Sequence, residues 1–209
     1  VIPHLHWVES DALTQRSVNT IVPAEGGMKG YSTDGLGFSL SLKEIGASMA
    51  QKRILLLGNG GAAAAIAWQA VKDGAASLTL LARNQKKAAQ LLAGLPQDSA
   101  CLLLADGIEN VKNHATTCDI LINATPLGME GFAGGDFADL SFLSALPKGA
   151  LVCDIVYRPA RPSLIMAAQR LGLPTLGGFG LLIWQALAAF EYFYGFRPSS
   201  ADRAFISAA

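Results

Sequence analysis

A short glycine-rich stretch carries the most recognisable chemistry of this sequence. Four apolar residues at positions 54–57 run directly into three glycines at 58, 60 and 61, and an alanine-rich segment follows. Where a strand, a tight turn and a helix meet in this way, the glycines permit the sharp turn and let the backbone approach a pyrophosphate. Ala63 lets the helix pack close to the sheet, and N–H groups at the helix start face the anion. The residues expected to hold a dinucleotide here are Gly58, Asn59, Gly60, Gly61 and Ala62.

The residues after the next expected strand favour NADP(H) over NAD(H). A site for NAD usually carries Asp or Glu about 20 residues beyond the glycines. The sequence has no carboxylate between Asp73 and Asp98, and Arg83 stands where the strand should end. A guanidinium group matches a 2′-phosphate through charge-assisted hydrogen bonds, and Lys86 and Lys87 add positive potential. If Arg83 were only an exposed residue of a loop, the absence of the Asp or Glu that is typical of an NAD site would remain unexplained.

Composition narrows the class of protein. Of 209 residues 51% are apolar, which suits a well-buried core, and 16 basic residues balance 16 acidic ones. We therefore expect neither nucleic acid nor a membrane as a partner. Three widely spaced cysteines indicate neither a disulfide framework nor a zinc site, and a reduced, cytoplasmic setting is expected. His4 and His6 have no third ligand nearby, so no metal site is expected.

The hydrophobic pattern from residue 52 onward alternates between strands and helices. Expected strands cover residues 54–57, 77–82, 100–104, 119–123, 151–156 and 174–176. Expected helices cover residues 62–72, 85–93, 108–114, 163–171 and 179–194, and residues 131–144 should form an irregular loop with a helical turn. Upstream, a hairpin of strands 18–22 and 28–32 precedes a helix capped by Thr33 or Asp34. This order predicts an α/β fold with a doubly wound, mainly parallel, Rossmann-like sheet.

Six short motifs then carry a resemblance. They are VNT at 18–20, GYSTDG at 30–35, GNGGA at 58–62, NATPLGM at 123–129, DIVYRP at 154–159, and GFGLL at 178–182 with Gln185. In this order they resemble the shikimate dehydrogenase family. The resemblance implies an oxidoreductase of the chorismate (aromatic amino-acid) pathway that reversibly reduces 3-dehydroshikimate to shikimate with NADP(H). It also implies part of a substrate domain at 1–34, a nucleotide domain at 35–176, and a helical return at 177–209, in a monomer or homodimer.

The resemblance assigns roles to individual residues. Asp34 would be catalytic and would bind substrate together with Asn19, Tyr157 and Gln185. The cofactor-binding residues implied beyond the glycine loop are Arg83, Asn84, Thr125, Met129, Ile155 and Gly178. Simpler interpretations stay open at several positions: a helix cap for Asp34, a turn residue for Asn19, core packing for Tyr157 and Met129, and a helix-entry turn for Gly178.

The departures from the family pattern also matter. The family's catalytic Lys and its carboxylate-binding Ser pair fall upstream of Val1, so we expect an upstream portion to be absent from this chain. A catalytically impaired NADP-binding module is the alternative. Ser32 replaces the usual Asn, while Arg16 and Ser17 replace a more usual Gly-Ala pair. These changes leave open a quinate-type or related substrate. If the chain were another dehydrogenase with the same nucleotide domain, Asn19, Asp34 and Gln185 would have no common role.

Overall fold

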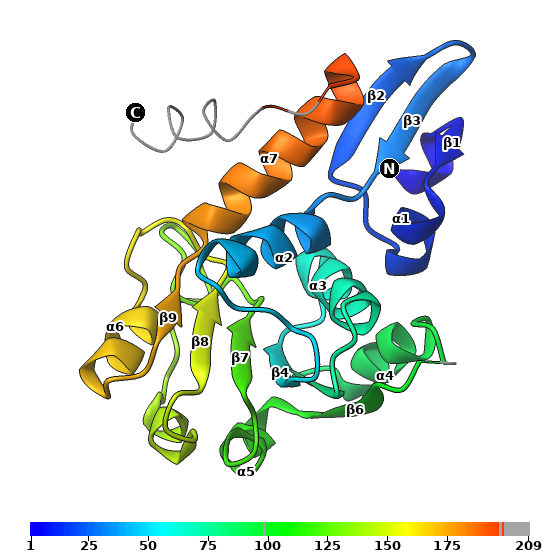
Figure 1. Cartoon of the computed structure of the whole chain (residues 1–209). Coiled ribbons are helices and arrows are strands. Elements are labelled where there is room, and N and C mark those ends of the chain that lie inside the picture. Colours follow the sequence, from blue (N-terminus) through cyan, green and yellow to red (C-terminus); the bar gives the residue numbers. More distant parts are fainter. Residues whose placement is uncertain (98, 197, 199–209) are drawn as a thin grey trace.

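A computed structural model describes residues 1–97, 99–196 and 198. Its main body is a six-stranded sheet in which every strand is parallel to its neighbours, in the order β6-β5-β4-β7-β8-β9. The strands are β4 (Arg53–Leu57), β5 (Ser77–Ala82), β6 (Leu102–Gly107), β7 (Ile120–Asn123), β8 (Leu151–Asp154) and β9 (Thr175–Leu176). Strand order reverses beside β4, which confirms the predicted doubly wound sheet (Figure 1).

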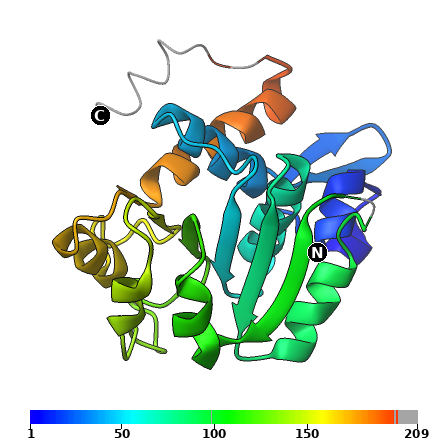
Figure 2. The same cartoon turned by 60° about the horizontal axis from the view of Figure 1, so that its bottom comes forward.

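The central strands are almost uninterrupted apolar runs because both faces of the sheet are covered. Along β4, Leu56 faces one hydrophobic core with Ile66, while Leu55 and Leu57 face a second core with Leu164. The first face is covered by α2 (Asp34–Glu44), α3 (Gly61–Lys72) and α4 (Gln85–Ala93). The second face is covered by α5 (Val111–Ala115), η3 (Ser141–Ala145) and α6 (Ser163–Arg170), with η2 (Ile108–Asn110) just before α5. Figure 2 shows strands β4, β5 and β6 side by side between these layers.

A second, three-stranded sheet lies apart from this body, in the order β1-β3-β2. It contains β1 (Trp7–Val8), β2 (Thr20–Ala24) and β3 (Gly27–Tyr31), and the antiparallel pairing of β2 with β3 confirms the predicted hairpin. The last helix, α7 (Phe179–Tyr194), leaves the main body and returns to this sheet (Figure 1), where Tyr192 stacks on Tyr31 with ring centroids 3.8 Å apart.

Helix α2 joins the two parts through glycines. A side chain at Gly35 would collide with the carbonyl oxygen of Ala65 in α3, and one at Gly37 would lie 2.7 Å from the backbone nitrogen of Gln185 in α7. Because neither glycine has a Cβ, α2 fits closely between these two helices. The start of α2 and the middle of α7 are thereby held near each other.

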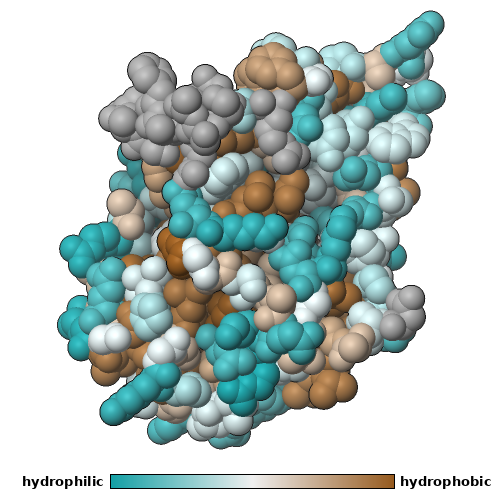
Figure 3. All heavy atoms as spheres, in the orientation of Figure 1, coloured by the Kyte–Doolittle hydropathy of each residue, from teal (hydrophilic) through white to brown (hydrophobic). Residues whose placement is uncertain are grey.

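Three elements near the N-terminus were not anticipated: η1 (Ile2–His4), β1 and α1 (Ser10–Gln15). Strand β6 also begins later and ends later than the predicted 100–104. On α7, the side chains of Phe179 and Phe193 are exposed. Figure 3, in the same orientation as Figure 1, shows hydrophobic residues at the surface in the upper half of the view. Within the described residues, no helix combines the length and the apolar character needed to cross a membrane.

Candidate cofactor and substrate site

A groove of about 430 Å³ opens at the carboxyl ends of β4, β5 and β7. Gly58 turns the chain there with φ 108°, and a Cβ at this position would lie 2.7 Å from the carbonyl oxygen of Ala124. At Gly60 the corresponding direction is open, with no atom within 4 Å. Residues expected from the sequence that line this groove are Gly58, Asn59, Gly60, Arg83, Asn84 and Thr125. The loop therefore offers the tight turn and free space that a pyrophosphate needs.

The start of α3 supplies hydrogen-bond donors at this groove. Gly60 is the N-cap, and its carbonyl oxygen accepts the first helical bond, from the nitrogen of Ala64 at 3.0 Å. The helix itself cannot satisfy the N–H groups of its first turn, and its dipole places partial positive charge at that end. Gly61 and Ala62 lie in this first turn. An anion seated here meets donors without a side chain in the way.

The loop after β5 is tied to the glycine loop. Asn59 donates from its side-chain amide to the carbonyl oxygen of Asn84 at 3.1 Å, and Asn84 caps α4 by accepting from the nitrogen of Lys87 at 2.9 Å. Arg83, between these contacts, is exposed and lines the groove. Among the described residues it forms no ion pair. Its guanidinium is thus available to an anionic ligand.

A buried polar chain fixes the other side of the groove. Asn123 accepts from the backbone nitrogen and the hydroxyl of Thr125, at 3.0 and 2.6 Å, and donates to Asp154 Oδ1 at 2.9 Å. The same Oδ1 accepts from the nitrogen of Val156 at 3.0 Å. Asp154 is 2% exposed and its Oδ2 has no partner within the described part of the chain. Burial in this apolar setting raises the pKa of Asp154 to about 7.

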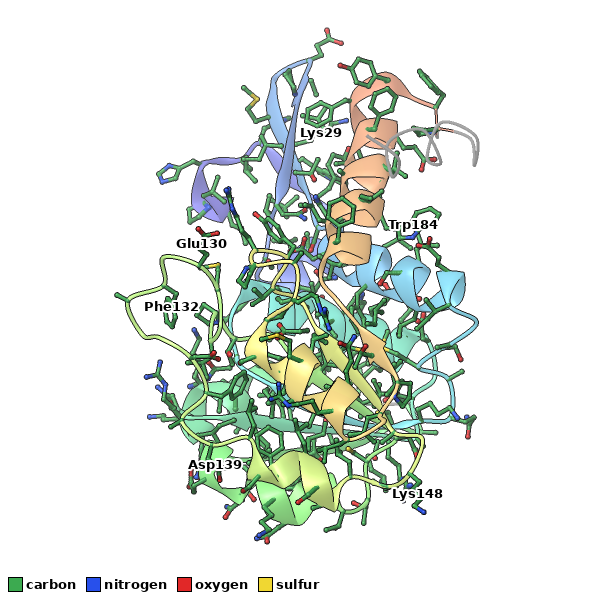
Figure 4. All side chains as sticks on the ribbon, turned by 90° about the vertical axis from the view of Figure 1, so that its left-hand side faces the viewer. Lys29, Glu130, Phe132, Asp139, Lys148 and Trp184 are labelled. Atoms are coloured by element: carbon green, nitrogen blue, oxygen red, sulfur yellow. The ribbon has the colours of Figure 1, made fainter. Side chains whose placement is uncertain are left out.

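The loop after β7 extends over the groove. Phe132 lines the groove from this loop, and Glu130 forms an ion pair with Arg158 at 3.0 Å (Figure 4). Met129 and Tyr157 do not line the groove, and they are 42% and 50% exposed. The interpretation of these two residues as core packing is therefore wrong, and their side chains are free to meet a ligand.

Gly178 lies against the loop after β8. A Cβ at Gly178 would collide with the carbonyl oxygen of Ile155, so these two residues are in backbone contact. Gly178 is also the N-cap of α7, which confirms the helix-entry interpretation as a structural role. Both residues lie outside the lining of the groove.

A separate cluster gathers polar side chains from three distant segments. The Asn19 amide donates to Asp34 Oδ1 at 2.6 Å and to the Thr33 hydroxyl at 3.0 Å, and it reaches Gln185 Oε1 at 3.5 Å. In return Asn19 Oδ1 accepts from the backbone nitrogen of Thr33 at 2.9 Å. Asn19 precedes β2, Asp34 opens α2 and Gln185 lies in α7. The structure therefore brings together three of the four substrate-binding residues expected from the sequence, while Tyr157 is not hydrogen-bonded to any of the three.

The carboxyl group of Asp34 is tuned by its surroundings. Desolvation raises the pKa of Asp34, and the hydrogen bond from Asn19 offsets part of that rise. Its side chain makes no capping hydrogen bond, and neither does the side chain of the N-cap residue Thr33. The polar contacts of Asp34 are thus directed at Asn19 rather than at the helix, unlike those of an ordinary cap.

The segment that carries Asn19 contacts the start of α3. A Cβ at Gly61 would lie 2.9 Å from the Ser17 hydroxyl, two residues before Asn19. Lys29, which the hairpin carries, lies over the Trp7 ring at 5.8 Å and is not in the cluster (Figure 4). The segment that leads to Asn19 therefore contacts the first turn of α3, next to the glycine loop.

Comparison with known proteins gives the family. The model of shikimate / quinate 5-dehydrogenases matches residues 40–155. The chain belongs to this family. A shikimate dehydrogenase (NADP(+)) from Streptococcus suis is 35% identical, over 93% of this chain and 68% of that relative. The crystal structure of Listeria monocytogenes shikimate 5-dehydrogenase with shikimate and NAD is 30% identical with a TM-score of 0.83, covering 94% of this chain and 69% of that one. The Thermus thermophilus enzyme with NADP(H) and shikimate is 27% identical with a TM-score of 0.79, covering 95% and 70%.

Several contacts of this shikimate / quinate dehydrogenase family member were missed by sequence reasoning. Thr33 is the N-cap residue of α2, as predicted, but its hydroxyl also links Asn19 to Gln185 and lies 3.4 Å from Gln185 Oε1. The pairing of Asn123 with Asp154 and the position of Phe132 were not anticipated. Both polar residues end adjacent parallel strands, a position that could have signalled their pairing.

Proposed function

We propose that this chain binds NADP(H) and interconverts shikimate and 3-dehydroshikimate, as an oxidoreductase of the shikimate dehydrogenase type. The observation that carries the proposal is the cluster of Asn19, Thr33, Asp34 and Gln185, whose Asn19 segment contacts the first turn of α3 through Ser17. The cluster offers amide, hydroxyl and carboxyl groups within one small space, and such groups can hold the vicinal hydroxyls of a polyhydroxylated ring acid. The names of the relatives add support to the same substrate.

The cofactor is held by groups with different tasks. The first turn of α3 binds the pyrophosphate, and Arg83 meets the 2′-phosphate from the end of β5. Thr125, Met129, Ile155 and Gly178 form the nicotinamide side, where the Asn123 contacts fix the position of Thr125. When bound, NADP⁺ supplies a hydride acceptor. An Asp or Glu near Arg83 would favour NAD(H), and the sequence has none there.

Asp34 is the proposed catalytic carboxylate. In its ionised form it accepts a hydrogen bond from a substrate hydroxyl and helps remove the proton during oxidation. Its raised pKa makes it a stronger base than an exposed aspartate. Asn19 and Gln185 orient the substrate hydroxyls, and Tyr157 reaches the substrate from the strand β8 side.

The proposed organisation follows the two sheets. Residues 1–34 and 177–209 form the substrate side and residues 35–176 bind the nucleotide, with α2 as the joint between them. A cytoplasmic location and a monomeric or homodimeric state remain part of the proposal.

The test combines binding and turnover. We expect NADPH to bind with micromolar affinity and NADP⁺ to be reduced in the presence of shikimate faster than with quinate. Asn19→Ala should weaken shikimate binding about tenfold, equivalent to the loss of a hydrogen bond of ~1.4 kcal/mol, without changing NADPH affinity.

The matched control is Gln169→Ala, which removes an exposed amide on α6 that contacts Arg161. This change should alter neither affinity. Failure of both shikimate and quinate to bind, or equal shikimate affinity for Asn19→Ala and the parent chain, would refute the proposed substrate. Arg83→Ala should weaken NADPH binding much more than NADH binding, and equal losses would contradict the role of Arg83.

A further inference from the structure

A second groove of about 900 Å³ adjoins the dinucleotide groove on the other side of the glycine loop. The two grooves share Asn59 and Gly60. The second one, here called the α1–α4 groove, runs between α1 and α4 and reaches the first turn of α3 at Gly61. Anything bound over the shared residues is therefore accessible to side chains of both grooves.

Two cations line the α1–α4 groove from opposite elements. Arg16 follows α1, and Lys87 lies in the first turn of α4. Among the described residues neither side chain forms an ion pair. Together with Arg83 in the first groove, they place three cationic side chains in the grooves that border the glycine loop, near donors at the start of α3.

The backbone at Arg16 is unusual. Arg16 is the C-cap of α1 with φ 52° and ψ 33°, in the left-handed region that favours glycine. In this conformation an arginine has a higher conformational free energy than a glycine would have. Residues held in such conformations are concentrated at functional sites.

A buried amide gives independent evidence that the groove takes a polar ligand. Gln15 lines the groove, is 7% exposed, and its Oε1 has no hydrogen-bond partner within the described residues. Buried amides in folded proteins nearly always have a partner. A hydroxyl or amino group of a ligand in the groove, or an ordered water, would supply the missing donor.

We propose that Arg16 is a cofactor-binding residue that contacts the phosphates of the adenosine half of the dinucleotide across the α1–α4 groove. The inference rests on the proposed NADP(H) function. A guanidinium fits phosphate oxygens through paired charge-assisted hydrogen bonds, and the shared residues Asn59 and Gly60 bring that half of the dinucleotide to the groove. Because Arg16 belongs to the segment before β2, the contact would tie the substrate side of the chain to the bound cofactor.

The test compares Arg16→Gly, Arg16→Lys and the parent chain by equilibrium binding. Adenosine 2′,5′-bisphosphate probes the adenosine phosphates, and nicotinamide mononucleotide lacks that half. Arg16→Gly should weaken NADPH and the bisphosphate about five- to tenfold, in the range of one charge-assisted contact at an exposed site. Arg16→Lys should restore part of the loss, and nicotinamide mononucleotide should bind all three proteins equally. Raising the salt concentration should reduce the difference between the parent and Arg16→Gly.

The glycine variant also separates binding from folding. Glycine adopts the left-handed conformation without penalty, so Arg16→Gly should melt at the same temperature as the parent or a higher one. If Arg16→Gly binds the bisphosphate within about twofold of the parent while Arg83→Ala binds it weakly, the inference about Arg16 is overturned and the proposed function stands. If the parent chain binds neither NADPH nor the bisphosphate, the proposed cofactor itself fails.

Discussion

Replacing Asp154 by Asn should change how the stability of this chain depends on pH. The Asp154 carboxyl is 2% exposed, and desolvation raises its pKa to about 7 from 3.8 for the unperturbed side chain. At ~1.36 kcal/mol per pKa unit, this difference corresponds to about 4 kcal/mol in favour of the protonated folded state. The carboxyl stays protonated in the folded chain while the unfolded chain ionises it.

The sign follows from proton binding. Between pH 3.8 and about 7 the unfolded chain holds fewer protons at this site, so the free energy of unfolding falls as pH rises and the loss is complete above about pH 7. Asn has no such titration. Its oxygen still accepts from Asn123 and Val156, but its amide NH2 group is buried without an acceptor, at a cost of about 1–3 kcal/mol at every pH. Asp154→Asn should therefore be less stable than the parent near pH 4 and about 1–3 kcal/mol more stable near pH 8.

The measurement is urea unfolding followed by tryptophan fluorescence at several pH values. The difference between variant and parent isolates Asp154, because other carboxyl groups contribute equally to both proteins. Asp139→Asn is the control with the opposite sign: hydrogen bonds from the Ser141 nitrogen and hydroxyl lower the pKa of Asp139, so its contribution is lost as pH falls. A stability difference for Asp154→Asn that does not vary with pH would refute the reasoning.

Three further predictions concern the loop, the cluster and the thiols. Gly58→Ala should lower the free energy of unfolding by about 1–3 kcal/mol in urea titrations and weaken NADPH binding at least tenfold, because its φ of 108° and the nearby Ala124 oxygen exclude a Cβ. Asp34→Asn should reduce shikimate turnover about 10²–10⁴-fold and remove the acidic limb of the pH–rate profile, which should lie above the range of an exposed aspartate. Burial raises the pKa of the Cys118 thiol to about 12 and also raises that of Cys153, so both should react with iodoacetamide at pH 8 only after urea is added.

The parallel sheet could be predicted because its strands carry their signal in the sequence. Strands buried on both faces are continuous apolar runs, and β5, α4 and α7 have the predicted bounds. The predicted bounds of β6, 100–104, lie before those in the structure, Leu102–Gly107, because the second half of the strand is not apolar. Its ladder with β5 continues to Gly107 through Asp106, which pairs with Leu81 and binds His114 at 2.8 Å. Backbone pairing of this kind leaves no hydrophobic pattern.

The short N-terminal elements escaped prediction for a different reason. Strand β1 has two residues and α1 has six, both shorter than the window over which periodicity can be recognised. Tertiary contacts determine them: β1 pairs in parallel with β3, and Asp11 of α1 forms an ion pair with Lys72 of α3 at 3.0 Å. Such elements form because a neighbour is present, so the local sequence alone gives little indication of them.

The polar cluster shows how a site can depend on residues that never touch a ligand. Asn19 and Gln185 are 166 positions apart, and the motifs predicted a shared substrate-binding role for them but not their geometry. Their meeting requires α7 to lie close to α2, and α2 to lie close to α3, which Gly37 and Gly35 permit by leaving no side chain in either contact. The same helix α2 begins at Asp34. Gly35 and Gly37 therefore determine where α2 lies, and with it the position of the proposed catalytic carboxylate of Asp34 relative to the glycine loop. The proposed proton transfer thus depends on the close contacts of α2 with α3 and α7.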